Sequence, residues 1–218
     1  MHIPWTTTAG GGCLVVSAVA LWSTLSGRGW HGLAAGGFGL LGLIWSGMGG
    51  ATMLCEAPAT AAARVVSGQA DVQVVCAGPV FGGQMLNPND AGWVMFSAEG
   101  VPDTVARVTG KVCAQLRSWR YLRHPGETTT PEQVWAINTV VHEAEHLSGI
   151  ANEAVAECAA IHDIPKAVVA MGRTETEGRA VAAAFYRAWY PIMPDGYRSS
   201  ECVAGGNLDA LRDGPIPS

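Results

Sequence analysis

Apolar residues are distributed unevenly along this chain of 218 residues. Two apolar runs, at 10–25 and 32–55, occupy most of the first quarter, and the only formally charged side chains from Thr6 to Ala63 are Arg28 and Glu56. A helix needs about 20 mostly apolar residues to cross a bilayer. The second run meets this length, whereas the first is marginal. We therefore expect residues 1–56 to form a transmembrane helical hairpin, in which the many glycines of the second run allow close helix packing.

The short connection between the two runs indicates an orientation. Its cation, Arg28, favours the cytoplasmic side of the membrane. A hairpin with this orientation places the C-terminal part of the chain outside the cytoplasm. In the alternative interpretation, the second run is a signal segment that is cleaved at the small residues near Ala59 or Ala61. Both interpretations export the rest of the chain.

Beyond the apolar runs, the pattern becomes that of a folded domain. We expect an Ala-rich linker or helix start at 57–69 and a domain over 70–218. Alternation of apolar and polar residues predicts strands at 70–76 and 92–97. Apolar residues at helical spacing predict a helix that begins near Pro102 and ends near Trp119.

The next predicted helix has the clearest end signals. Thr130 is a natural N-cap, Pro131 suits the first helical position, and Gln133 completes a capping box. The helix should continue to about Ser148 and end at Gly149, which favours a left-handed C-terminal cap.

Two more helices follow. Asn152 is the N-cap expected for a helix that reaches about Ile164, just before Pro165. The last helix is expected from Thr174 to about Tyr190. The predicted fold class is therefore mainly α, with α+β as an alternative: a transmembrane hairpin followed by a small helical domain with a minor β element.

Charge and cysteine content refine this picture. The net charge of −5 provides no basic surface, so nucleic acid is not expected as a partner. Four dispersed cysteines in an exported domain predict two disulfides, for which three pairings exist. We favour Cys158–Cys202, which would join the tail after about Tyr190 to the helix that begins at Asn152. We also favour Cys76–Cys113, which would join the first strand to the helix near 102–119.

The candidate chemistry lies in the best-marked helix, which contains the sequence His-Glu-Ala-Glu-His at 142–146. Residues four apart lie on one face of a helix, so His142 and His146 can present two imidazoles to one metal ion. Glu143 would stand beside them as a general base for water on the metal. The apolar residues Val140 and Val141 favour this interpretation over two solvated histidines at an exposed helix end.

A third metal ligand is expected on the following helix. Glu153 and Glu157 are separated by one helical turn in an almost wholly apolar segment. Buried carboxylates are costly unless they are paired, hydrogen-bonded or bound to metal. We expect Glu153 to be the ligand and Glu157 to hold a histidine N–H behind it, although the two roles could be exchanged. In the alternative, both glutamates pair with the arginines at positions 107, 173 or 179.

Over residues 142–157 the chain resembles the zincin metallopeptidases, specifically the gluzincins, whose third ligand is a glutamate. The resemblance implies a zinc ion held by His142, His146 and a downstream glutamate, with Glu143 polarising the catalytic water. The chain is also similar to small exported bacterial proteins that combine this motif with a late Tyr-x-x-x-x-Cys, here Tyr197 and Cys202.

The chain departs from the gluzincin pattern in two respects. Glu145 is charged where the family usually has an uncharged residue, and the interval from His146 to Glu153 is short. The position of the glycine after the motif is similar to that in metzincins, but their third ligand would fall at Asn152, and asparagine binds zinc poorly.

The sequence thus predicts a membrane-anchored zinc metallopeptidase that hydrolyses peptide or protein substrates outside the cytoplasm. An alternative of another class is a non-catalytic membrane assembly or interaction protein whose metal site is structural or a relic. An open coordination position and turnover of an unstructured protein would favour the enzyme, whereas a fourth protein ligand would favour the alternative.

Overall fold

The computed structural model describes residues 54–77, 80–81, 84–85, 91–122, 124 and 127–209. The membrane hairpin predicted over residues 1–56, including Arg28, lies outside these residues except for its last three, Leu54, Cys55 and Glu56. None of the helices formed by the described residues has the length and apolar character needed to span a membrane. By its internal contacts the chain divides into two units, and the second begins at Leu54.

The segment expected at 57–69 as a linker or helix start is a helix, over residues 54–67, that belongs to the core. The buried side chains of this helix recur at helical spacing: Cys55, Ala59, Ala62, Ala63 and Val66. The Thr60 hydroxyl accepts a hydrogen bond of 3.0 Å from the backbone N–H of Val74, which fixes the helix against the first strand. The linker alternative is therefore wrong, and the helix start is confirmed. Alanines give only a weak hydrophobic signal in a sequence, although their small side chains are readily buried.

The central sheet has three strands in the order β1-β5-β4. Strand β1 (Gln73–Ala77) pairs in parallel with β5 (Pro102–Thr109), and β5 pairs in antiparallel fashion with β4 (Gly92–Phe96). The strands predicted at 70–76 and 92–97 correspond to β1 and β4 and are confirmed. A separate two-stranded ribbon pairs β2 (Val80–Phe81) with β3 (Gln84–Met85).

The helix predicted from Pro102 to Trp119 is wrong in its first half, which forms β5. Only α3 (Gly110–Arg117) and the short π-helix η1 (Ser118–Leu122) are helical. Ala106 and Val108 are fully buried at alternate positions of β5, between the two neighbouring strands. Threonine and valine fit such a pleated surface well, so strand pairing on both sides outweighs the helical spacing of the apolar residues.

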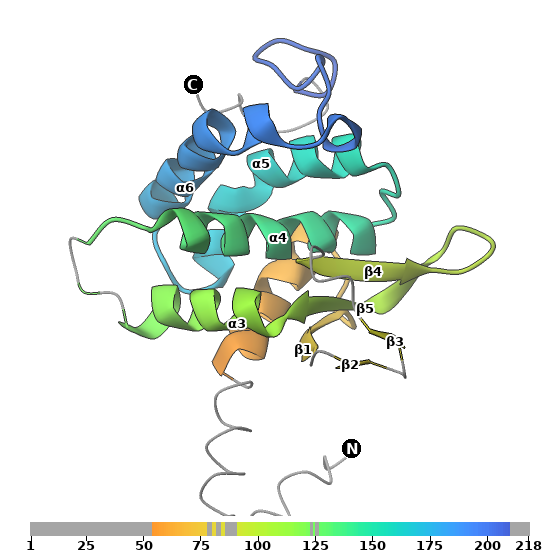
Figure 1. Ribbon diagram of the computed structural model, residues 1–218, viewed down its shortest axis with the longest axis horizontal. Coiled ribbons are helices and arrows are strands. Elements are labelled where there is room, and N and C mark those ends of the chain that lie inside the picture. The colour runs from red at the N-terminus through yellow and green to blue at the C-terminus, as the bar shows by residue number, and fades with distance from the viewer. Residues whose placement is uncertain are drawn as a thin grey trace, which may run out of the picture. The chain divides into compact units, whose positions relative to one another are not determined.

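Three longer helices complete the domain, so its described residues are mainly helical with a small sheet, as expected. Helix α4 (Pro131–Leu147) crosses the middle of the domain and contacts α3, β4 and β5 on one side and α5 (Glu153–Ala170) on the other, as Figure 1 shows. Helix α6 (Glu175–Ala188) packs on α5. Two short 3-10 turns, η2 (Tyr190–Ile192) and η3 (Asp195–Tyr197), follow.

The end signals of the helices are mostly confirmed. Thr130 caps α4 with the capping box formed by Gln133, and Asn152 caps α5. The predicted end of α5 before Pro165 is wrong, because the helix continues through the proline to Ala170. Gly178 of α6 lies so close that a Cβ there would be 2.6 Å from the Pro165 Cα atom. Helix α6 therefore packs closely on α5 at the proline itself.

Both favoured disulfides are present in the structure. Cys76 on β1 is joined to Cys113 on α3, and Cys158 on α5 is joined to Cys202 in the tail. The tail is also held by hydrogen bonds, because the Tyr186 hydroxyl donates to the Cys202 carbonyl over 3.1 Å. The second disulfide therefore fastens the last described segment to the helix that carries Glu153 and Glu157.

Removing the tail disulfide should destabilise the domain. The Cys158→Ala/Cys202→Ala variant is expected to lose roughly 2–4 kcal/mol in the free energy of unfolding, because the crosslink closes a long loop. Denaturant unfolding of the variant beside the wild type measures the loss. An unchanged unfolding midpoint would contradict the prediction.

Candidate metal centre

The two motif histidines come together with Glu153 at the junction of α4 and α5. His142 and His146 lie on one face of α4 and are buried. The chain then reverses at Gly149, whose φ of +103° lies in the left-handed region that glycine adopts readily. This tight turn brings Glu153, the first residue of α5, back to the histidines. The Oε2 atom of Glu153 lies 2.9 Å from His142 Nε2 and 3.2 Å from His146 Nε2.

The three side chains fit a zinc ion by chemistry and by spacing. Two imidazole nitrogens and one carboxylate oxygen form a donor set that is common in catalytic zinc sites. Ligand atoms at about 2.0–2.1 Å from a tetrahedral zinc ion lie about 3.3 Å apart. The two Nε2 atoms are 3.0 Å apart, and their distances to Glu153 are close to the same value. Within the described part of the chain, this is the one group of histidines and a carboxylate whose donor atoms converge in this way.

Acceptors behind the histidines orient both rings. Glu157 Oε2 lies 2.7 Å from His142 Nδ1, and the amide of Asn138 donates a hydrogen bond of 2.8 Å to the other oxygen of Glu157. The Nδ1 atom of His146 lies 2.6 Å from the carbonyl oxygen of Ile150. Such acceptors favour a proton on Nδ1, which leaves each Nε2 lone pair available to a metal ion.

The histidines and the neighbouring glutamates shift one another's pKa values. Burial by itself lowers the pKa of His142, but the contacts with Glu153 and Glu157 outweigh it and raise the pKa to about 10. Hydrogen bonds from His142 and His146 lower the pKa of Glu153 to about 2. The proton that His142 holds in this arrangement is the one that a metal ion would displace, since ligand histidines bind metals in their neutral form.

Glu143 is buried beside the histidines without taking part in the converging group. Its Oε2 atom is buried and has no hydrogen-bond partner among the residues that the structure describes. Burial raises the pKa of Glu143 to about 7, against the opposing effect of His142 and His146. Room for this side chain comes from Gly92 of β4, where a Cβ would lie 2.8 Å from Glu143 Oε1. A carboxylate with this pKa and no fixed partner is suited to accept a proton near neutral pH.

Two aromatic rings border the histidines. The ring of Phe96, at the end of β4, meets the His146 ring edge-on at a centroid distance of 6.0 Å. The ring of Tyr197, from η3 in the tail, lies 5.6 Å from the His142 ring. Strand β4 and the disulfide-linked tail therefore both contribute to the surroundings of the group.

The structure thus brings together the site residues named from the sequence, with Glu153 at both Nε2 atoms and Glu157 behind His142. Sequence reasoning missed Gly92, Asn138 and the carbonyl of Ile150. Asn138 had a usable signal, because it lies one turn before His142 on the same face of an apolar helix. The spacing of Gly92 from the motif carries no signal in the sequence.

Comparisons with known proteins add no assignment to this geometry, since no family model matches the chain and neither does any curated protein or solved structure.

Proposed function

We propose that the protein is a zinc-dependent peptidase, with His142, His146 and Glu153 as the zinc ligands. The observation that carries the proposal is the convergence of their three donor atoms next to Glu143, whose buried Oε2 has no hydrogen-bond partner in the described part of the chain. A structural metal site requires no such base. The likeness of the motif to that of the gluzincins supports the same reading.

The chain's own residues have distinct roles in this proposal. A zinc ion, when bound, would lower the pKa of a coordinated water to about 7 and polarise a substrate carbonyl. Glu143 takes the proton from the attacking water and delivers it to the leaving amine. Glu157 and the Ile150 carbonyl keep the two imidazoles in the orientation that their contacts define.

The position of β4 supports a polypeptide as the substrate. Among the described strands β4 lies at the outside of its sheet, with β5 as its neighbour. Its first residue, Gly92, approaches Glu143, and its last, Phe96, contacts His146, so the strand runs along the candidate centre. An extended peptide that pairs with a strand edge presents a carbonyl at regular intervals. Such pairing would place a scissile bond beside Glu143.

The experiment that tests the proposed function combines metal analysis with an activity assay. The purified protein is expected to contain about one zinc per chain, the number that one three-ligand site implies, and to cleave an unstructured protein. A chelator should abolish cleavage, and added zinc should restore it. Zinc that is present without any cleavage would favour the non-catalytic alternative instead.

Filling the space beside Glu143 should impair hydrolysis without removing zinc. In the Gly92→Ala variant the new Cβ meets the Glu143 carboxylate and displaces it. We expect kcat to fall by roughly tenfold or more, since misplaced catalytic groups have effects of this size. Gly110→Ala is the matched control, because a Cβ there meets no atom of the described residues within 4 Å. Equal activity of the two variants would contradict the role of Gly92.

We further propose that the first apolar runs are retained as a membrane anchor and that the domain lies outside the cytoplasm. Two disulfides support an oxidising compartment. Retention is supported by Ala59 and Ala62, which are core residues of the helix over 54–67, so cleavage near Ala59 or Ala61 would cut through that helix.

Retention predicts full-length protein in the membrane fraction that resists extraction with carbonate. N-terminal sequencing of the mature protein provides the second measurement. A soluble product that begins within residues 57–63 would contradict the anchor and leave the zinc proposal intact.

A further inference from the structure

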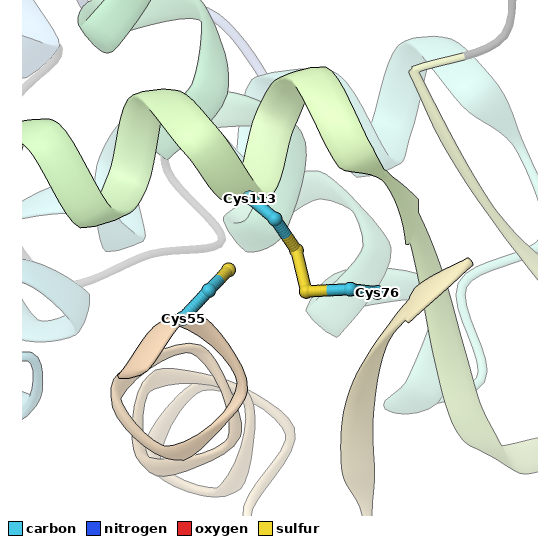
Figure 2. A group of neighbouring side chains, drawn as sticks. All are labelled: Cys55, Cys76 and Cys113. Carbon is cyan, nitrogen blue, oxygen red and sulfur yellow. A yellow bond between two sulfur atoms is a disulfide. The ribbon is translucent and has the colours of Figure 1, made fainter. Parts of the chain in front are cut away.

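A buried thiol lies directly beside one of the two disulfides. Cys55, on the helix over 54–67, is 1% exposed and forms no disulfide with another cysteine that the structure describes. Its sulfur and those of Cys76 and Cys113 all lie within 4.8 Å of one another. Figure 2 shows the Cys55 side chain pointing toward the disulfide, with the three cysteines contributed by three different elements. The proposed peptidase reaction uses none of these sulfurs.

Flanking hydrogen bonds hold the three sulfurs in this arrangement. The carboxylate of Glu56 accepts a hydrogen bond of 2.8 Å from the backbone N–H of Cys76. One turn later, Thr60 is hydrogen-bonded to Val74 in the same strand. The first turns of the helix over 54–67 are therefore fixed along β1, so the proximity of Cys55 to the disulfide is built into the packing.

We propose that Cys55 is an internal exchange partner of the Cys76–Cys113 disulfide. In the exchange, Cys55 loses its proton to solvent, and its thiolate attacks one sulfur of the disulfide. A new bond forms to that sulfur, the Cys76–Cys113 bond breaks, and the released sulfur leaves as a thiolate that takes up a proton. The step is an isomerisation that requires no external oxidant or reductant.

The environment of Cys55 keeps this exchange slow in the folded protein. Burial, reinforced by Glu56 and opposed by Arg117, raises the pKa of Cys55 to about 12. The thiolate is the attacking species, so only a very small fraction of the molecules is reactive near neutral pH. Burial also keeps external thiols away from Cys55. We therefore expect the exchange only under alkaline conditions, or when the helix over 54–67 transiently separates from β1 and α3.

The exchange would change which elements are covalently joined. In the observed pairing, β1 is fastened to α3. After attack on Cys113, the helix over 54–67 is fastened to α3, and Cys76 becomes a free thiol on β1. After attack on Cys76, the same helix is fastened to β1 instead. The domain thus holds three sulfurs for one crosslink.

The test uses the full-length chain with Cys13→Ser in all samples, so that Cys55 is the one cysteine left over from the two disulfides. Non-reducing peptide mapping is performed on Cys76→Ser and on Cys113→Ser. Each variant lacks one sulfur of the native pair, so the oxidant that closes the disulfides during export must join Cys55 to the remaining sulfur. We expect a Cys55–Cys113 crosslink in the first variant, a Cys55–Cys76 crosslink in the second, or both. The Cys158–Cys202 link in the same digest reports that the variant has folded. Folded variants in which Cys55 stays free in both cases would overturn the proposal.

A second arm requires no change to the three sulfurs. The protein with the native pairing is incubated at neutral and at alkaline pH, acidified to stop the exchange, and then unfolded near neutral pH with a maleimide that labels free thiols. Label on Cys76 or Cys113, together with Cys55 in a disulfide, is expected at alkaline pH and should disappear in Cys55→Ala. If alkaline incubation yields no disulfide that contains Cys55, the exchange does not occur and the proposal fails, whether or not the serine variants fold.

Discussion

Glu143→Gln is expected to lose peptide hydrolysis almost completely while it retains its zinc. Glutamine has nearly the same shape as glutamate, but its amide cannot accept a proton from water. General acid–base catalysis typically contributes about 10²–10⁴-fold to a rate, and we expect kcat to fall by a factor in this range. Glu143 does not belong to the group of converging donor atoms, so zinc binding should be unaffected.

The measurement pairs steady-state hydrolysis of an unstructured protein with zinc analysis of the same sample. Glu132→Gln is the matched control, because Glu132 lies in the first turn of the same helix and is exposed. The control should retain full activity. A Glu143→Gln variant that cleaves within a few-fold of the wild-type rate would remove Glu143 from the mechanism and leave the metal site in place.

The His142→Ala/His146→Ala variant is expected to lose its zinc entirely. Two of the three donors are removed, and one partly exposed carboxylate, Glu153, cannot hold the ion alone. Zinc should fall from about one per chain to background. His124→Ala is the control, since His124 is an exposed loop residue. Full retention of zinc by the double variant would refute the site.

Single variants of the two glutamates separate a ligand from a supporting residue. Glu153→Ala should lose zinc, whereas Glu157→Ala should weaken zinc affinity by about 10–100-fold, the usual effect of removing an outer partner of a ligand. Competition with a chromogenic chelator measures both affinities. If Glu157→Ala loses zinc while Glu153→Ala binds it normally, the two residues exchange roles in the proposal.

Local signals in the sequence were sufficient to predict both ends of the helix that carries the histidines. The capping residues around Thr130 and the turn at Gly149 act within a few residues, so their meaning does not depend on the rest of the fold. The reversal at Gly149 also explains why Glu153 could be named in advance, because a short turn returns the start of the next helix to the end of the previous one.

The predictions of secondary structure were wrong where contacts with distant segments of the chain determine which element forms. Residues 102–109 carry apolar spacing that suits a helix, and they form a strand because β1 and β4 pair with them on both sides. Pro165 lies inside α5, at the point where Gly178 of another helix approaches it very closely. The proximity of Gly92 to Glu143 likewise depends on how the sheet packs against α4. Such contacts join segments that are far apart in the sequence, so no local pattern of residues can predict them.

The tail disulfide has a consequence for when the tail becomes attached beside the candidate centre. Cys158 follows Glu157 directly in the sequence, and Cys202 fastens the segment that places Tyr197 against the His142 ring. In reducing surroundings the chain would carry all of its proposed zinc ligands, but this segment would lack its covalent attachment to α5. Oxidation would then add this attachment after the chain had reached a compartment in which the bond can form, and would fix Tyr197 covalently to the helix that carries Glu153.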